Sequence, residues 1–142
     1  MAISKPWSEA WQRGMADPSC RYHQLVSQWA HLKRAGNAGR MFAGLADQSF
    51  AIFGLGTLGL ILFDELAEAD FSPAWIIENR PELAGGRFQG IDVIQTQLLW
   101  CNPVDVVIVT PVFAYPQICQ EIMGYRPAVE TINLATLIHG TN

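Results

Sequence analysis

Residues 50–59 read FAIFGLGTLG, and this stretch decides the fold. Its first four residues form a continuous apolar run, which is typical of a central parallel strand that is covered on both faces. Glycines follow at positions 54, 56 and 59, where an apolar, helix-compatible segment begins. Because this G-x-G-x-x-G pattern comes directly after a predicted strand and opens a predicted helix, it indicates a turn that binds the diphosphate of a dinucleotide.

Each glycine of the turn has a separate physical task. Gly54 permits the tight turn, Gly56 lets a phosphate approach the backbone, and Gly59 lets the helix pack closely on the strand. The free N–H groups at the start of the helix, together with the helix dipole, then favour a bound anion. The predicted cofactor-binding turn consists of Gly54, Leu55, Gly56, Thr57, Leu58 and Gly59.

A second group of candidate ligand contacts ends the next predicted strand, residues 74–78. Glu78 follows Gly59 by 19 residues, and an acidic side chain in this position accepts hydrogen bonds from both hydroxyls of an adenosine ribose. Its charge would repel a 2′-phosphate and favours NAD, whereas Arg80 argues the other way and leaves NADP open. Asn79, between them, completes the group. The alternative for Glu78 is a solvent-facing carboxylate at a strand end.

A third candidate contact, Thr110-Pro111, ends the most β-branched run of the chain, residues 104–109. In an open parallel sheet, the carboxyl ends of the strands line the ligand crevice. Pro111 ends the strand and removes a backbone donor, which leaves Thr110 to face the ligand. An ordinary strand-to-helix connection is the alternative.

From residue 49 onwards, predicted strands alternate with short helices. This order indicates an α/β fold, an open parallel sheet of about five strands built from right-handed βαβ units and flanked by helices. The expected strands are residues 50–53, 74–78, 91–94, 104–109 and 129–134, and the expected helices are residues 60–70, 95–100 and 116–123. The expected organisation is a helical extension, residues 1–48, followed by a dinucleotide-binding domain, residues 49–142.

The N-terminal extension carries an apolar stripe. Five residues follow the spacing i, i+3, i+4, i+7 and i+10 of an amphipathic helix, namely Tyr22, Leu25, Val26, Trp29 and Leu32. A shorter helical pattern with Trp7, Trp11 and Met15 precedes Asp17-Pro18-Ser19, which breaks it. These helices provide a homodimer or partner-protein surface, or the stripe packs on the sheet of its own domain.

Composition argues against several other classes of function. The net charge is −4, with only nine lysines and arginines and no basic stripe, so nucleic-acid binding is not expected. The charge-free run of residues 49–63 is shorter than the roughly 18–20 residues of a membrane-spanning helix, so no membrane span is expected. Scattered histidines and the lack of a C-x-x-C pair indicate no metal site. The N-terminus lacks the apolar segment of a secretory signal, which predicts a cytoplasmic location.

Four motifs in the same order resemble a known group of proteins. They are GLGTLG at 54–59, IIENRPELAG at 76–85, GIDV at 90–93 and DVVIVTP at 105–111. The run from Phe50 to about Ile138 is similar to the NAD(P)-binding Rossmann domain superfamily. In particular, it resembles the Rossmann domains of polysaccharide-biosynthesis nucleotide-sugar dehydratases, sugar O-acyltransferases and redox-sensing repressors. The resemblance implies an adenine dinucleotide, or less often a nucleotide sugar or coenzyme A, in the crevice.

A catalytic apparatus is not recognisable. There is no Tyr-x-x-x-Lys pair, and no lysine occurs after Lys33. Tyr115 follows the Thr-Pro strand end and reaches the crevice, or it is a surface or helix-capping tyrosine. We therefore hypothesise a small NAD(H)-binding module that acts as a sensor or an accessory subunit. The alternatives are an oxidoreductase or nucleotide-sugar-modifying component completed by a partner chain or by dimerisation, and a scaffold used only for protein interaction.

Overall fold

The structure is a computed structural model that describes residues 18–36 and 38–140. The predicted first helical segment, with Trp7, Trp11 and Met15, lies outside the described residues. The second predicted helix is present as α2 (Pro18–Arg34). It ends at Gly36, whose φ of 77° is in the left-handed region that favours glycine.

Six strands form one mixed sheet. They are β1 (Phe50–Phe53), β2 (Trp75–Ile77), β3 (Arg87–Phe88), β4 (Ile91–Ile94), β5 (Val106–Val109) and β6 (Glu130–Asn133). Their order is β3-β4-β2-β1-β5-β6, and only β3 is antiparallel to its neighbour. The five parallel strands, counted in chain order, are thus arranged 3-2-1-4-5, which is the order of a doubly wound nucleotide-binding sheet. The predicted α/β fold class is confirmed.

The register of β1 brings three candidate segments to one edge of the sheet. Phe53, the last residue of β1, is level with Ile77 of β2 and with Val109 of β5. The residues that follow these strands, Gly54, Glu78 and Thr110, therefore leave the sheet at the same edge. The order of the strands also makes β1 and β5 the point where the connections change direction, and ligands of open α/β sheets bind at such a point.

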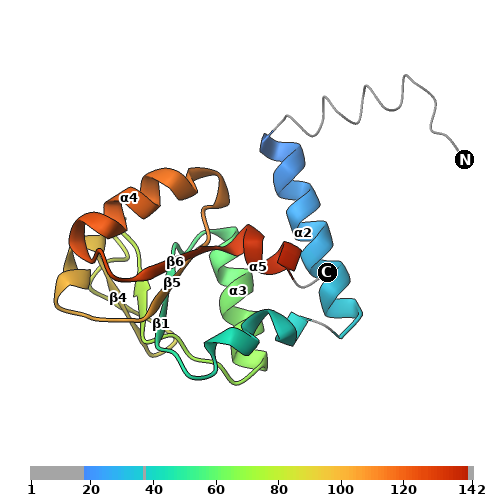
Figure 1. The fold of residues 1–142 in the computed structure, drawn as a ribbon, viewed down its shortest axis with the longest axis horizontal. Helices are drawn as coiled ribbons and strands as arrows, with labels where there is room; N and C mark the ends of the chain where they lie inside the picture. Colours follow the sequence, from blue (N-terminus) through green and yellow to red (C-terminus); the bar gives the residue numbers. More distant parts are fainter. Residues whose placement is uncertain (1–17, 37, 141–142) are drawn as a thin grey trace, which may run out of the picture.

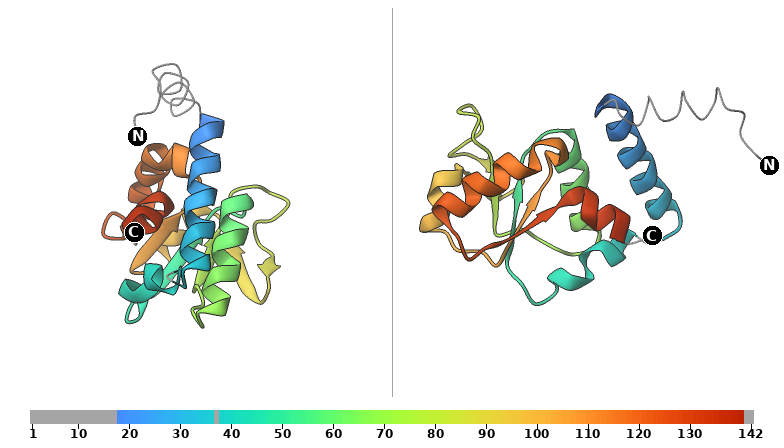
Figure 2. Two further views of the ribbon diagram at one scale, coloured as in Figure 1. Left: turned by 90° about the vertical axis from the view of Figure 1, so that its right-hand side faces the viewer. Right: turned by 45° about the horizontal axis from the view of Figure 1, so that its top comes forward.

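Helices cover both faces of the sheet, as Figure 1 and Figure 2 show. One face is covered by α2, η1 (Ala38–Leu45), α3 (Thr57–Glu68) and α5 (Leu134–Gly140). The other is covered by η2 (Thr96–Trp100) and α4 (Tyr115–Tyr125), and η3 (Val112–Ala114) joins β5 to α4. Successive residues of β5 point to opposite faces, so that Val106 and Ile108 enter the first core and Val107 and Val109 the second.

The apolar stripe of α2 packs within its own domain, where α2 lies against α5 and η1. Leu25, Trp29 and Leu32 are only 4%, 2% and 2% exposed, and they share a hydrophobic core with Ile52 and Ile108. Burial of each such side chain contributes about 1.5–3 kcal/mol. An ion pair of 2.9 Å between Lys33 Nζ and a carboxylate oxygen of Glu65 also ties α2 to α3. These three side chains are therefore not available as a dimer surface.

Two elements differ from the sequence-based expectation. The unpredicted β3 pairs with β4 through the two-residue loop Gln89-Gly90, and both loop residues have positive φ, at 48° and 83°. This combination is typical of a type I′ hairpin turn. The expected strand 129–134 ends at Asn133, because α5 begins at Leu134. The Asn133 carboxamide oxygen accepts a hydrogen bond of 3.0 Å from the Ala135 N–H and so supports the start of that helix.

Candidate functional site

The glycine turn is built by close backbone packing. Gly54 has a φ of 101°, and a Cβ at this position would lie 2.7 Å from Thr110 Oγ1. A Cβ at Gly59 would collide with the carbonyl oxygen of Gly54. Both positions therefore require glycine, the first for its conformation and for space, the second because helix α3 passes so close to the turn.

Gly56 differs from the other two glycines because a Cβ there would meet nothing within 4 Å. Its backbone is extended, with φ −79° and ψ −168°, and it precedes the first residue of α3. No side-chain hydrogen bond from the described residues caps this end of the helix. Gly56 and Thr57 are both exposed. Open space thus lies directly in front of a helix start with free donors, which is the arrangement that binds a phosphate.

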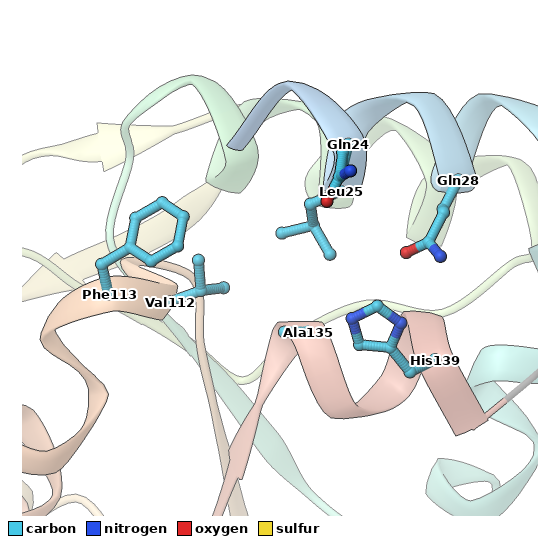
Figure 3. A pocket seen from close by; sticks show the side chains of 7 residues that line it. All are labelled: Gln24, Leu25, Gln28, Val112, Phe113, Ala135 and His139. Atoms are coloured by element: carbon cyan, nitrogen blue, oxygen red, sulfur yellow. The ribbon is translucent and has the colours of Figure 1, made fainter. Parts of the chain in front are cut away.

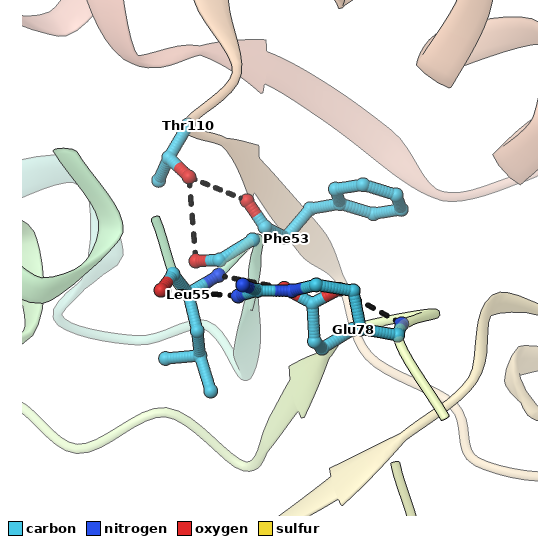
Figure 4. Close-up of polar contacts among 6 residues, drawn as sticks. Phe53, Leu55, Glu78 and Thr110 are labelled. Carbon is cyan, nitrogen blue, oxygen red and sulfur yellow. Dashed lines mark hydrogen bonds and ion pairs between the residues drawn. The ribbon is translucent and has the colours of Figure 1, made fainter. Parts of the chain in front are cut away.

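The Glu78 carboxylate is bound to the turn and to Arg80 (Figure 4). Its Oε1 accepts hydrogen bonds from the Leu55 N–H at 3.2 Å and from Arg80 Nη2 at 2.8 Å. Its Oε2 accepts the Arg80 N–H at 3.1 Å. Arg80 Nη2 also donates to the Leu55 carbonyl oxygen at 3.3 Å. The strand end of β2 and the glycine turn are therefore joined through these three residues.

These contacts set the charge state of the pair. Burial alone would raise the pKa of Glu78, but hydrogen bonds from the Arg80 side chain, the Arg80 N–H and the Leu55 N–H outweigh it. With the charge of Arg80, they lower the pKa of the carboxyl below its ordinary value of 4.5. In turn, the carboxylate raises the pKa of Arg80. The Glu78 side chain is 12% exposed and that of Arg80 is 49% exposed, so the guanidinium lies on the solvent side of the carboxylate.

Asn79 points away from the turn. Its carboxamide oxygen accepts hydrogen bonds from the Thr96 N–H at 2.9 Å and from the Thr96 hydroxyl at 3.1 Å. Its amide nitrogen donates to the Glu121 carboxylate at 3.1 Å. Both ends of the side chain are therefore used to join the end of β2 to η2 and α4, and Asn79 is separated from the predicted ligand contacts around it.

Thr110 supports the turn from inside the protein. Its side chain is buried, at 2% exposed, and its hydroxyl donates to the Phe53 carbonyl oxygen at 2.7 Å (Figure 4). The Gly54 carbonyl oxygen is 3.3 Å from the same hydroxyl. Pro111, which follows, is exposed. The hydroxyl of Thr110 is thus used by the backbone that leads into the turn.

A groove of about 380 Å³ lies between α2, η3 and α5. Seven side chains line it: Gln24, Leu25, Gln28, Val112, Phe113, Ala135 and His139. Figure 3 shows Gln28 of α2 and His139 of α5 pointing toward one another from facing helices. No local sequence pattern indicates this groove, because its lining residues come from three separate parts of the chain.

Of the comparisons with known proteins, only the one with solved structures found matches. No protein-family model matches the chain, and no curated protein matches it. Among solved structures, it is similar to UDP-D-quinovosamine 4-dehydrogenase from Vibrio fischeri, with a TM-score of 0.45 and 20% identity over 67% of this chain and 86% of that chain. RSP, a Rex-family repressor, matches with a TM-score of 0.50 and 16% identity over 73% of this chain and 60% of the repressor. RSP in complex with β-NADH matches with a TM-score of 0.47 and 16% identity, over 72% and 60% of the two chains. This chain has a Rossmann-like fold.

Tyr115, at the start of α4, makes contacts within the protein. The Tyr115 hydroxyl donates to the Thr131 carbonyl oxygen at 3.0 Å and lies 3.1 Å from the Thr131 hydroxyl. Burial, the largest cause, raises the pKa of Tyr115 above 10.0. Tyr115 therefore joins α4 to β6, and its hydroxyl stays protonated at neutral pH.

The described part of the chain holds neither a metal-binding cluster nor a membrane-spanning helix. Across residues 18–36 and 38–140, no group of three or more histidine, cysteine, aspartate or glutamate side chains is arranged to hold a metal ion. Within the same ranges, no helix is both long enough and apolar enough to cross a membrane.

Proposed function

We propose that this protein is a small module that binds an NAD-type dinucleotide through the glycine turn and acts as a sensor or an accessory subunit. The single observation that carries the proposal is the open space in front of Gly56, at the exposed start of α3. Gly54 and Gly59 are required by the packing of the protein itself, but Gly56 is not. A bound ligand that occupies the space beside the Gly56 Cα would explain why this position carries a glycine.

The residues around the turn fit the diphosphate of a dinucleotide. The N–H groups at the start of α3 would donate to its oxygens, and the helix dipole would favour its charge. The turn lies where β1 and β5 end side by side, at the change in direction of the connections. Gly54, Leu55, Gly56, Thr57, Leu58 and Gly59 remain the proposed diphosphate contacts.

The Glu78–Arg80 pair would receive the adenosine ribose. Arg80 covers the carboxylate from the solvent side, so the ribose hydroxyls would have to replace its hydrogen bonds to Glu78. The Leu55 N–H would keep its bond to Glu78 and hold the carboxylate in place. A 2′-phosphate would instead be drawn to Arg80, so the pair itself decides between NAD and NADP.

A role in sensing or holding the nucleotide suits the side chains at the crevice. Thr110 and Tyr115 use their hydroxyls for contacts within the protein. The likeness to a Rex-family repressor, at a TM-score of 0.50, supports the shared fold and is compatible with this role.

The substitution Gly56→Val tests the proposal directly. Valine adopts extended backbone, and a Cβ at this position meets nothing within 4 Å, so the variant should fold, but its side chain would occupy the phosphate space. The matched control is Gly124→Val in α4, where a Cβ also meets nothing within 4 Å. Wild type and control should bind NADH, which is measured by quenching of tryptophan fluorescence, and Gly56→Val should not.

A thermal shift provides a second measurement. At a ligand concentration of 100 times Kd, binding should stabilise the wild-type protein by roughly 2.7 kcal/mol. An unchanged melting temperature with millimolar NADH or NADPH would overturn the proposal. Turnover of the nucleotide with a co-purified partner chain would move the assignment from a sensor to a component of an oxidoreductase, with the same glycine turn as its binding site.

A further inference from the structure

We propose that the groove between α2, η3 and α5 is a ligand subsite for an uncharged group that donates hydrogen bonds, and that Gln28 is the residue that recognises it. The groove has a volume of about 380 Å³. Sites for small molecules have volumes of roughly 300–1,000 Å³, so the groove is large enough for part of a ligand or for one small molecule.

The carboxamide oxygen of Gln28 carries the inference. It is buried, and no described residue donates a hydrogen bond to it. Buried acceptors without a partner are rare, because they lose their hydrogen bonds to water and gain none in return. A ligand with an N–H or O–H group would supply the missing donor.

The other lining residues define the chemistry of the ligand. Gln24 and His139 provide further hydrogen-bonding groups on facing helices (Figure 3). Leu25, Val112 and Ala135 provide an apolar wall. No lysine, arginine, aspartate or glutamate lines the groove, so the lining favours hydrogen-bonding groups over strongly charged ones. A carboxamide or the hydroxyls of a sugar, on a partly apolar ring, match this lining.

The groove opens close to the glycine turn. Val112 directly follows Thr110-Pro111, whose atoms lie against Gly54. Helix α5, which supplies Ala135 and His139, begins at the carboxyl end of β6. The groove therefore lies at the same edge of the sheet as the turn, so its occupant is either the far end of a molecule bound at the turn or a separate small molecule. The first of these two occupants rests on the proposed function, and the separate small molecule does not.

This subsite gives α2 a part in binding. Gln24, Leu25 and Gln28 belong to a helix that precedes the first strand of the sheet, whereas Val112 and His139 lie in the last third of the chain. A ligand in the groove would join these parts, and its arrival or loss would change how firmly α2 is held against α5.

The test compares Gln28→Met with wild type in the full chain. Methionine keeps the length of the side chain and removes the amide oxygen. The matched control is Gln120→Met, an exposed glutamine of α4. Affinities for NADH, ADP-ribose, nicotinamide and glucose are measured by calorimetry for all three proteins, together with the free energy of unfolding without ligand.

Two results would support the inference and identify the source of the ligand. If the far end of the dinucleotide occupies the groove, Gln28→Met weakens NADH binding by about tenfold and leaves ADP-ribose binding unchanged, because one buried hydrogen bond is lost. If a separate molecule occupies it, wild type binds nicotinamide or glucose and Gln28→Met does not, while NADH affinity is unchanged. Gln120→Met behaves as wild type in both cases.

The inference is overturned if Gln28→Met binds all four probes as wild type does and differs only in stability. This result differs from the result that would overturn the proposed function. If wild type binds neither NADH nor ADP-ribose, the dinucleotide assignment fails, and the nicotinamide and glucose measurements still decide whether the groove is a site.

Discussion

The backbone N–H of Leu55 donates a 3.2 Å hydrogen bond to the carboxylate of Glu78, across 23 residues of sequence. The Leu55 N–H of the glycine turn is therefore held by Glu78, the residue that the sequence predicts to contact the ribose. Arg80 binds the same carboxylate and the Leu55 carbonyl oxygen, so its guanidinium covers the contact between Leu55 and Glu78 on the solvent side. The contacts of the turn therefore depend on the same side chains that, under the proposed function, would select the nucleotide.

Replacing Arg80 should improve the binding of NADH. In Arg80→Leu, the ribose hydroxyls no longer compete with a guanidinium for Glu78, so the affinity for NADH should rise. The rise should be only severalfold, because the exposed ion pair that the ribose displaces in wild type contributes little free energy. The affinity for NADPH should fall, because the positive charge beside the 2′-phosphate is gone. Calorimetric titration of both nucleotides measures the two changes. A parallel fall in both affinities would show that Arg80 does not compete with the ribose.

The stability of the protein should depend on pH through Glu78. The pKa of this group is lowered in the folded protein, so its contribution is fully present above its ordinary value of 4.5 and is lost as the pH falls through the lower, folded-state pKa. The difference in the free energy of unfolding between wild type and Glu78→Gln should therefore shrink as the pH is lowered from 6 toward 3, about the range in which carboxyl groups titrate.

Urea unfolding at several pH values measures this difference. Asp64→Asn, at an exposed position of α3, is the control for the loss of one negative charge. A difference between wild type and Glu78→Gln that stays constant over the whole range would contradict the role assigned to the carboxylate.

The fold and the turn were predictable because their signals are local. The run Phe50–Phe53 and the glycines after it are contiguous, and their spacing sets the backbone path whatever the rest of the chain does. The register that brings Gly54, Glu78 and Thr110 to one edge then follows from the parallel sheet itself. Placing Glu78 near the turn therefore needed only the order of the strands.

The directions of individual side chains were not predictable in this way. Asn79 turns toward Thr96 and Glu121, 17 and 42 residues further along the chain, because both ends of its amide find partners there. The apolar stripe predicts that α2 is an amphipathic helix, but the groove beside Gln28 exists only once α5 packs against that helix. Such contacts depend on tertiary packing, about which one local pattern carries no information.

Removing the Thr110 hydroxyl should destabilise the protein and weaken binding at the turn. Thr110→Val has nearly the same shape but cannot donate to the Phe53 carbonyl oxygen, so it should lose about 1 kcal/mol of stability. Thr110→Ser, which keeps the hydroxyl, is the control for the shape of the side chain. Urea unfolding gives the stability, and NADH titration gives the affinity. Equal affinities for valine and serine variants would mean that the hydroxyl does not position the turn.

The same substitution should have opposite effects at two helical glycines. In Gly59→Ala, the new Cβ collides with the Gly54 carbonyl oxygen, and since both atoms belong to packed backbone, the turn must shift. Overpacking of this kind costs about 1–3 kcal/mol, more than the gain of up to about 1 kcal/mol from replacing glycine by alanine in a helix. In Gly124→Ala, the Cβ enters open space, so only the gain remains. Urea unfolding should therefore place Gly59→Ala below wild type and Gly124→Ala at or above it. NADH binding should weaken only in Gly59→Ala, because a shifted turn displaces the N–H groups at the start of α3. If Gly59→Ala were as stable as Gly124→Ala, helix α3 would not be held against Gly54, and the geometry proposed for diphosphate binding would be lost with it.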